Sequence, residues 1–140
     1  MGDPIMNIGK CNLTLHCEVS YGRTVKDAAN CMKKNKTRTS FITKNGIPMG
    51  LISAVDIINE VVATGKNPAK TKVESVMRTP LHACHADDSV VDAYFKMAHH
   101  NLVMVPVLKG NKIIGILTAQ EVMKQFIKHG GKHGTRKSRR

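Results

Sequence analysis

The chain repeats itself with an offset of 65 residues, and this duplication restricts its fold more than any other feature. Sliding the sequence by that offset aligns residues 14–62 with residues 79–127 without a gap, and eight of the 49 pairs are identical. The strongest run aligns Gly50–Ile57 with Gly115–Val122, where seven of eight positions keep their character. One copy alone would bury little surface. Two copies that share a core therefore explain the repeat.

Helix signals stand at the same places in both copies. Thr24 is followed three positions later by Asp27, and Ser89 by Asp92, which is typical of a helix N-cap with an acid in the first turn. Apolar residues then recur at helical spacing. The pattern predicts helices over residues 24–35 and 89–100.

A hairpin is predicted after each of these helices. Lys44-Asn45-Gly46 and Lys109-Gly110-Asn111 are turn sequences, and each lies between two short apolar stretches. The predicted strands are residues 39–43 and 47–52 in the first copy, and residues 102–108 and 112–117 in the second.

A second helix is predicted to follow each hairpin. Its N-caps are Ser53 and Thr118, with Asp56 and Glu121 at the third helical position. These helices are predicted to end at Gly65 and at Gly130-Gly131. Each repeat thus has the order strand–helix–strand–strand–helix. This order places the chain in the α/β class, with two tandem repeats packed by a pseudo-twofold axis.

Both copies resemble the CBS motif. In the second copy the resemblance rests on Val73–Met77, Thr79-Pro80-Leu81, Ser89-Val90, Ala93, Met97, Val105-Pro106-Val107, Gly115–Thr118 and Glu121-Val122. In the first copy it rests on Thr24-Val25, Ala28, Met32 and Gly50–Ile58, with Ile5-Met6 in the place of Val76-Met77.

The resemblance implies a paired arrangement called a Bateman module. It assigns residues 5–66 to the first repeat, 67–72 to a linker and 73–128 to the second repeat. Residues 129–140 remain as a basic tail. The resemblance also implies a homodimer and an unknown protein effector that responds to the module.

Members of this family bind adenosine-containing ligands, so the resemblance implies AMP, ADP, ATP or S-adenosylmethionine in two clefts between the repeats. Such a nucleotide is a regulatory ligand, and no further cofactor is required. In the family pattern a hydroxyl residue and an acid contact ribose and phosphate. These roles fall here on Ser53 with Asp56, and on Thr118 with Glu121.

The resemblance places the adenine base against backbone and apolar side chains from neighbouring segments. Arg38, with Lys34 and Lys36, would neutralise the phosphates. Phe41 either stacks on the base or fills the core, and we favour the core. The remaining residues assigned to the nucleotide are Thr14, Ser40, Leu81, His82, Val105 and Pro106.

A simpler interpretation of the same residues stays open. Ser53 with Asp56, and Thr118 with Glu121, also form ordinary capping boxes that need no ligand. Glu121 departs from the aspartate of the family pattern, and its extra methylene is expected to push the carboxylate outward. We therefore rank the site at Asp56 first.

Half of the net charge lies in the C-terminal segment. Lys128–Arg140 hold six of the 22 basic residues and none of the ten acidic ones, so residues 1–127 carry 16 basic against 10 acidic, or +6 of the total +12. Residues 129–140 are rich in glycine and lack an apolar anchor, which predicts disorder. The simpler role is a solubilising tail. The alternative function is nonspecific nucleic-acid binding through Lys128–Arg140, with the repeats as scaffold.

The cysteines and histidines raise the question of a metal. His82-Ala83-Cys84-His85 forms one group, and Cys11 with His16-Cys17 forms another. Neither has the paired C-x₂₋₄-C spacing that is usual for zinc. We interpret them as surface histidines and free buried cysteines, and we predict no metal site.

Composition and motifs exclude several classes of protein. No apolar run approaches the roughly 18 residues that span a bilayer, and the first ten residues lack the apolar core of a signal peptide. There is no Gly-x-Ser-x-Gly, P-loop or HExxH motif. We therefore expect a cytoplasmic regulatory protein that is neither an enzyme nor bound to a membrane.

Overall fold

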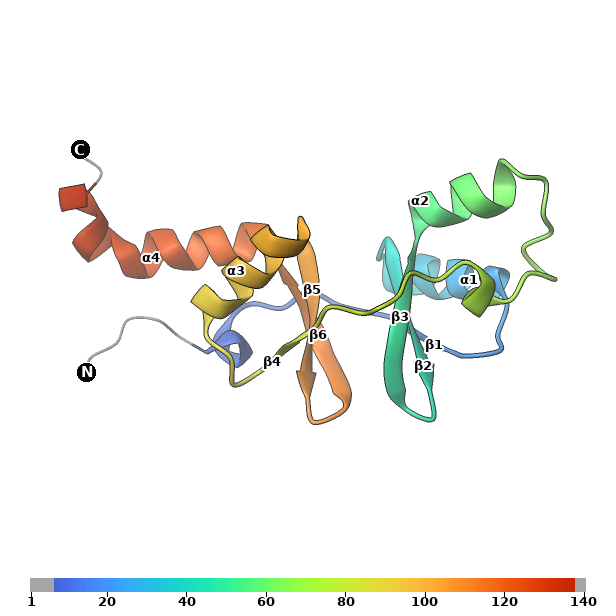
Figure 1. Cartoon of the computed structure of the whole chain (residues 1–140), viewed down its shortest axis with the longest axis horizontal. Helices are drawn as coiled ribbons and strands as arrows, with labels where there is room; N and C mark the ends of the chain where they lie inside the picture. Colours follow the sequence, from blue (N-terminus) through green and yellow to red (C-terminus); the bar gives the residue numbers. More distant parts are fainter. Residues whose placement is uncertain (1–6, 138–140) are drawn as a thin grey trace. The chain divides into compact units, whose positions relative to one another are not determined.

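The computed structural model describes residues 7–137, and the side chains of residues 7–129. Ile5, Met6 and residues 138–140 lie outside the described residues. The chain forms two compact units (Figure 1). One unit, which we call unit B, consists of residues 15–81, and the other, unit A, joins residues up to 14 to residues 82 onward.

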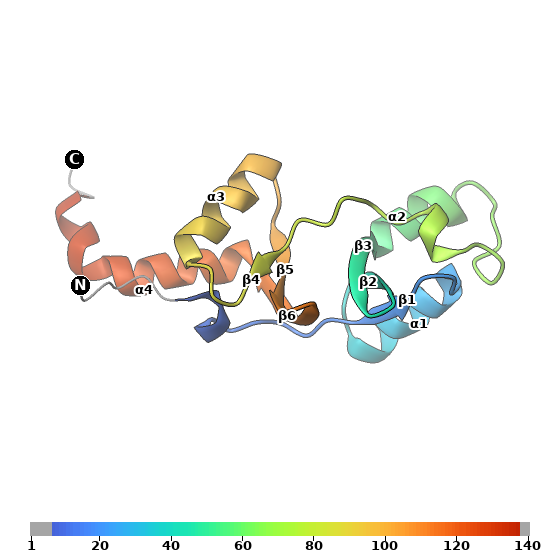
Figure 2. The ribbon, with the colours of Figure 1, turned by 60° about the horizontal axis from the view of Figure 1, so that its bottom comes forward.

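Unit B contains a three-stranded sheet in the order β1-β2-β3. β1 pairs in parallel with β2, and β2 pairs antiparallel with β3. In both views α1 and α2 lie on the same side of this sheet (Figures 1 and 2). The elements are β1 (Glu18–Ser20), α1 (Val25–Asn35), β2 (Thr39–Lys44), β3 (Ile47–Ser53), α2 (Ala54–Ile57), the π-helical turn η2 (Ile58–Val62) and the 3-10 turn η3 (Val73–Ser75).

Unit A repeats this plan. Its sheet has the order β4-β5-β6, with β4 parallel to β5 and β6 antiparallel to β5. The elements are η1 (Ile8–Lys10), β4 (Cys84–His85), α3 (Val90–His100), β5 (Met104–Lys109), β6 (Lys112–Thr118) and α4 (Ala119–Lys137). The predicted order strand–helix–strand–strand–helix is therefore confirmed in both units.

The helix starts follow from their caps. The Thr24 side chain accepts the Asp27 N–H, and the Asp27 side chain accepts the Thr24 N–H, which completes a capping box before α1. The Ser89 side chain accepts the Asp92 N–H before α3. Lys36 and Asn101 end these helices in the left-handed conformation, with φ of 57° and 55°. The helices predicted over 24–35 and 89–100 are thus confirmed to within one residue.

The buried cores explain why the two copies have the same fold although few of their positions are identical. Three identical pairs on the first helices, Val25/Val90, Ala28/Ala93 and Met32/Met97, are all buried. Each unit has its own cluster of aliphatic residues around them. Both hairpins also carry a register shift at equivalent places, after Ile42 and after Val107. The two copies therefore share their buried packing positions and their strand register.

The compact units do not coincide with the predicted repeats 5–66 and 73–128. Thr14 pairs with Ile116 on β6, so the N-terminal segment packs in unit A. Arg78 pairs with Leu51 on β3, so the segment after residue 66 packs in unit B. The second strand of each hairpin, β3 or β6, thus pairs with a segment near the start of the other predicted repeat. The linker predicted at 67–72 is likewise part of unit B.

The predicted end of the last helix is wrong. α4 continues through Gly130-Gly131 to Lys137, so residues 129–137 are helical and not the disordered tail that we expected. Each glycine in a helix interior costs only about 1 kcal/mol relative to alanine. A helix that has already formed gains one hydrogen bond for each residue added, which allows it to pass two glycines.

Candidate functional site

Asp56 lies at the start of α2 and is almost entirely buried, with 6% of its surface exposed. The Ser53 N–H donates to Asp56 Oδ2 over 3.0 Å, and the Asp56 N–H donates to the Ser53 hydroxyl over 3.1 Å. The predicted capping box is therefore present. It fixes the Asp56 carboxylate at the end of β3.

Arg78 is the residue of this site that the sequence analysis missed. Its Nε and Nη2 both donate to Asp56 Oδ1, over 2.9 and 2.6 Å. Burial raises the pKa of the Asp56 carboxyl, but the hydrogen bonds from Arg78 and Ser53 outweigh it and hold that pKa below its usual value. The Arg78 side chain is itself 66% exposed. The result is a buried carboxylate that carries a solvent-facing guanidinium.

Glu121 is the corresponding acid of unit A, and its observed position corrects our expectation. Its carboxylate does not point outward, because the residue is only 6% exposed. Glu121 Oε2 accepts the Asn12 N–H over 2.9 Å and the Gln125 Nε2 over 2.7 Å. The longer side chain therefore binds the segment that crosses β6. Gln125 stands at the i+4 position of the same helix, a spacing that could have revealed the pair.

Both acids thus hold the segment that pairs with the outer strand of their hairpin. Asp56 binds the side chain of Arg78, whose backbone pairs with β3. Glu121 binds the backbone of Asn12, two residues before the pairing with β6. A carboxylate offers about four acceptor sites. Arg78 and Ser53 use three on Asp56, and Asn12 and Gln125 use two on Glu121, so each acid keeps acceptor capacity.

The structure divides the predicted nucleotide residues into two sets. Each set lies within one unit and includes one hydroxyl–acid pair. Unit B holds Ser53, Asp56, Arg38, Ser40, Phe41 and Leu81; unit A holds Thr118, Glu121, Thr14, His82, Val105 and Pro106.

Two residues of β2 lie near the Asp56 site by strand register. Ser40 pairs with Ile52, one residue before the Ser53 cap. Ser40 is fully buried, and its hydroxyl has no hydrogen-bond partner among the described residues. Such a group ordinarily has a partner. Phe41 is also fully buried, which agrees with the core role that we favoured for it.

The predicted phosphate-neutralising residues separate in the structure. The Arg38 carbonyl accepts the Ala54 N–H over 2.9 Å, which places exposed Arg38 beside the start of α2. Lys36 is the left-handed cap of α1. Lys34 lines a groove between α1 and β1. Of the three, only Arg38 is tied by a hydrogen bond to α2.

The histidine and cysteine groups are distributed differently. Cys11, Cys17 and Cys84 are buried and free. The rings of His82 and His100 stack with centroids 3.8 Å apart. Among the described residues, no three His, Cys, Asp or Glu side chains come together as metal ligands would. In the same part of the chain, no helix has the length and apolarity needed to cross a bilayer.

Comparison with known sequences identifies residues 73–128 as a match to the CBS domain family model. The CBS domain-containing protein YhcV of Bacillus subtilis is 29% identical over 99 residues, which are 71% of this chain and 70% of YhcV. The chain spans 39% or less of the length of five further curated relatives that it matches.

Comparison with solved structures shows the same fold. The CBS domain pair of protein MJ0100, in complex with 5'-methylthioadenosine and S-adenosyl-L-methionine, matches with a TM-score of 0.71 at 23% identity, covering 92% of this chain and 99% of that chain. The CBS domain protein PAE2072 of Pyrobaculum aerophilum, complexed with AMP, matches with a TM-score of 0.71 at 20% identity, covering 83% and 89%.

Proposed function

We propose that this chain, in which residues 73–128 match the CBS domain family, is a regulatory module that binds an adenine nucleotide at Asp56. The ligand class is AMP, ADP, ATP or S-adenosylmethionine. Two solved proteins of this fold carry AMP, or methylthioadenosine with S-adenosylmethionine, in their complexes. The role proposed for this chain is to sense such a ligand, without catalysis and without a further cofactor.

The chemistry of the Asp56 site suits a ribose with an attached phosphate. The acceptor site that remains on Asp56 takes a hydrogen bond from a ribose hydroxyl. Arg78, oriented by its two hydrogen bonds to Asp56, offers its outer guanidinium nitrogen to a phosphate. Exposed Arg38, beside the start of α2, adds a second positive charge.

One observation carries the proposal: an exposed guanidinium held on a buried carboxylate at the hydroxyl–acid motif. A capping box alone requires no arginine. Asp27 of the capping box at Thr24 is also paired with an arginine, Arg23, but there the acid side chain is 34% exposed, against 8% for Asp56. Besides the guanidinium of Arg78, the hydroxyl of Ser40 on the neighbouring strand is a second polar group available to a ligand, because it has no hydrogen-bond partner among the described residues.

The occupied module would pass its state to a protein effector or to a second copy of the chain. The partner that we propose first is a second copy of the chain. Exposed apolar side chains recur at equivalent positions of the two second helices, Ile58 and Val62 on η2, and Met123 and Ile127 on α4. Such patches are typical of interaction surfaces.

The proposal predicts that calorimetry with AMP, ATP and S-adenosylmethionine will detect binding in the micromolar range for at least one of them. Asp56→Asn should weaken that binding by about tenfold or more, equivalent to about 1.4 kcal/mol. The charge and part of the hydrogen bonding to ribose are lost, while the side-chain volume is kept.

Asp27→Asn is the matched control, because Asp27 has the same capping geometry and an arginine partner. It should leave nucleotide affinity unchanged. No heat with any of the three ligands, or equal loss in both variants, would contradict the proposed site. The melting temperature of each variant without ligand separates lost binding from lost folding.

A second candidate function is nonspecific nucleic-acid binding by the basic C-terminal segment. Lys128–Arg140 hold six basic residues and no acidic residue. The segment contains no aromatic residue, so contacts would be to phosphates and sensitive to salt.

Deletion of residues 129–140 removes five of these positive charges. We expect the truncated chain to elute from heparin and to release RNA at a distinctly lower salt concentration than the full chain. The repeats should keep the melting temperature of the full chain, because among the described side chains every member of the two core clusters precedes residue 127. Unchanged elution would exclude the segment as the contact.

A further inference from the structure

The two units carry different side chains at equivalent positions beside the start of the second helix. The Arg38 carbonyl accepts the Ala54 N–H over 2.9 Å in unit B, and the Val103 carbonyl accepts the Ala119 N–H over 2.8 Å in unit A. Arg38 and Val103 are separated by the offset of 65 residues. They therefore occupy the same place in the two copies, which is a cation in unit B and an aliphatic side chain in unit A.

The position of Arg78 shows the same difference. Its counterpart at the offset of 65 residues is Leu13. A methyl group on Gly50 would lie 2.6 Å from the Arg78 carbonyl oxygen, and a methyl group on Gly115 would lie 2.7 Å from Leu13 Cβ. Both residues thus pass close to the equivalent glycine of their hairpin. Unit A has a leucine where unit B has an arginine.

Unit A forms the same architecture without either arginine. It builds the hairpin and the cap of the second helix with Val103 and Leu13 in their places. Glu121 accepts its hydrogen bonds from a backbone amide and a glutamine, without a cation. The fold therefore does not require the two positive charges that unit B carries at these positions.

Both arginines of unit B are accessible to a ligand. The Arg78 side chain is 66% exposed, and Arg38 is exposed as well. Arg38 forms no ion pair with any side chain that the structure describes. Arg78 donates to Asp56 through Nε and Nη2, which leaves Nη1 outside this contact. A guanidinium oriented by a carboxylate is well suited to bind a phosphate.

We propose that the Asp56 site selects adenosine ligands that carry a 5′-phosphate, and that the chain binds one such ligand. This inference rests on the function proposed above. The phosphate of AMP is negative, whereas S-adenosylmethionine has a positive sulfonium on the same 5′ carbon. A positive group beside Arg78 and Arg38 is repelled. Unit A has neither cation at the equivalent positions, so Glu121 lacks the corresponding phosphate contacts.

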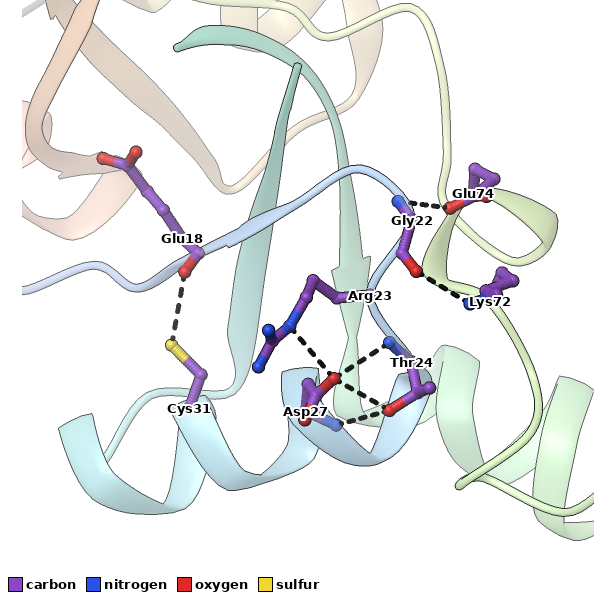
Figure 3. Close-up of polar contacts among 8 residues, drawn as sticks. All are labelled: Glu18, Gly22, Arg23, Thr24, Asp27, Cys31, Lys72 and Glu74. Carbon is purple, nitrogen blue, oxygen red and sulfur yellow. Dashed lines mark hydrogen bonds and ion pairs between the residues drawn. The ribbon is translucent and has the colours of Figure 1, made fainter. Parts of the chain in front are cut away.

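Arg23 is the matched control for Arg78 within unit B. Figure 3 shows it beside Asp27, whose Oδ2 it contacts through Nε over 3.2 Å. The same oxygen accepts the Thr24 N–H and hydroxyl, so Asp27 also belongs to a capping box. The Arg23 side chain is 62% exposed, close to the value for Arg78. Its substitution removes an equally exposed charge while leaving Asp56 and its partners in place.

The first test compares AMP, adenosine and S-adenosylmethionine by calorimetry on the full chain. We expect AMP to bind at one site per chain and about tenfold or more tighter than adenosine. S-adenosylmethionine should bind no tighter than adenosine. Added salt should weaken the binding of AMP and leave that of adenosine almost unchanged, because salt screens exposed charges.

The outcomes separate this inference from the proposed function. Equal affinities for AMP and adenosine, tightest binding of S-adenosylmethionine, or two AMP sites per chain would overturn the inference, while nucleotide binding itself would stand. If none of the three ligands binds, the proposed function fails and the inference fails with it.

The second test measures the ratio of AMP affinity to adenosine affinity in variants. Arg78→Gln should reduce this ratio to about threefold or less, and Arg78→Lys, which keeps the charge, should retain more of it. Arg38→Gln should also reduce the ratio, and it keeps the test open if Arg78→Gln does not fold. Arg23→Gln should retain the ratio of the wild type. An unchanged ratio in both the Arg78→Gln and Arg38→Gln variants, or an equal loss in Arg23→Gln, would overturn the role of these arginines.

Discussion

Gly50→Ala is expected to lower the free energy of unfolding by about 1–3 kcal/mol, the usual cost of overpacking a tight core. A methyl group at Gly50 would lie only 2.6 Å from the carbonyl oxygen of Arg78. That oxygen accepts the Leu51 N–H over 3.2 Å, and the Arg78 N–H donates back to Leu51 over 2.7 Å. The backbone cannot retreat without breaking this bridge and displacing Arg78 from Asp56.

Urea unfolding followed by circular dichroism measures this effect. Gly115→Ala should behave similarly in unit A, because its methyl group would lie 2.7 Å from Leu13 Cβ. The control Lys112→Ala changes an exposed residue of β6 and should alter the free energy by less than about 0.5 kcal/mol. If Gly50→Ala unfolds at the same urea concentration as this control, the Arg78 segment does not lie as close to Gly50 as the structure indicates.

Asp56→Ala is expected to destabilise the chain by about 2–4 kcal/mol at neutral pH. The lost hydrogen bond from the Ser53 N–H contributes about 0.5–1 kcal/mol, and the lost charged hydrogen bonds to Arg78 contribute about 1.5–3 kcal/mol. Asp27→Ala, at the more exposed cap of α1, should cost less, about 1 kcal/mol. Equal losses in the two variants would mean that Arg78 adds nothing to the cap at Asp56.

The contribution of the Asp56 carboxylate to stability has a defined pH dependence. The folded pKa of Asp56 lies below its usual value, so the unfolded chain binds this proton more readily. The resulting stabilisation is complete above the unfolded pKa of about 3.9 and disappears as the pH falls through the lower folded pKa. The difference in unfolding free energy between the wild type and Asp56→Asn should therefore be constant near neutrality and shrink below about pH 4. A difference that grew on acidification would contradict the assignment.

The elements that the sequence predicted correctly depend on contacts between near neighbours. Thr24 caps α1 through a residue three positions away, and the turn at Asn45-Gly46 has the positive φ values that such a turn needs, 54° and 80°. Residue types and short spacings contain this information. The tight turns and caps could therefore be read from one copy and checked against the other.

The repeat itself also held information on packing. Its identical apolar pairs on the first helices are buried in both units, so identity at the offset of 65 residues marks core positions there. The end of α4 was not predicted, because glycine pairs often end helices and nothing local distinguishes a helix that continues past them.

What the sequence determined by itself is a duplicated α/β half-unit with a hydroxyl and an acid at the start of each second helix. Only the tertiary structure showed that Asp56 holds Arg78, 22 residues away, and that Glu121 holds Asn12, 109 residues away. The physical reason is that a carboxylate accepts hydrogen bonds from whichever donors the fold places within reach. Those donors come from segments that pair with β3 and β6 across the chain, where sequence spacing has no bearing on distance.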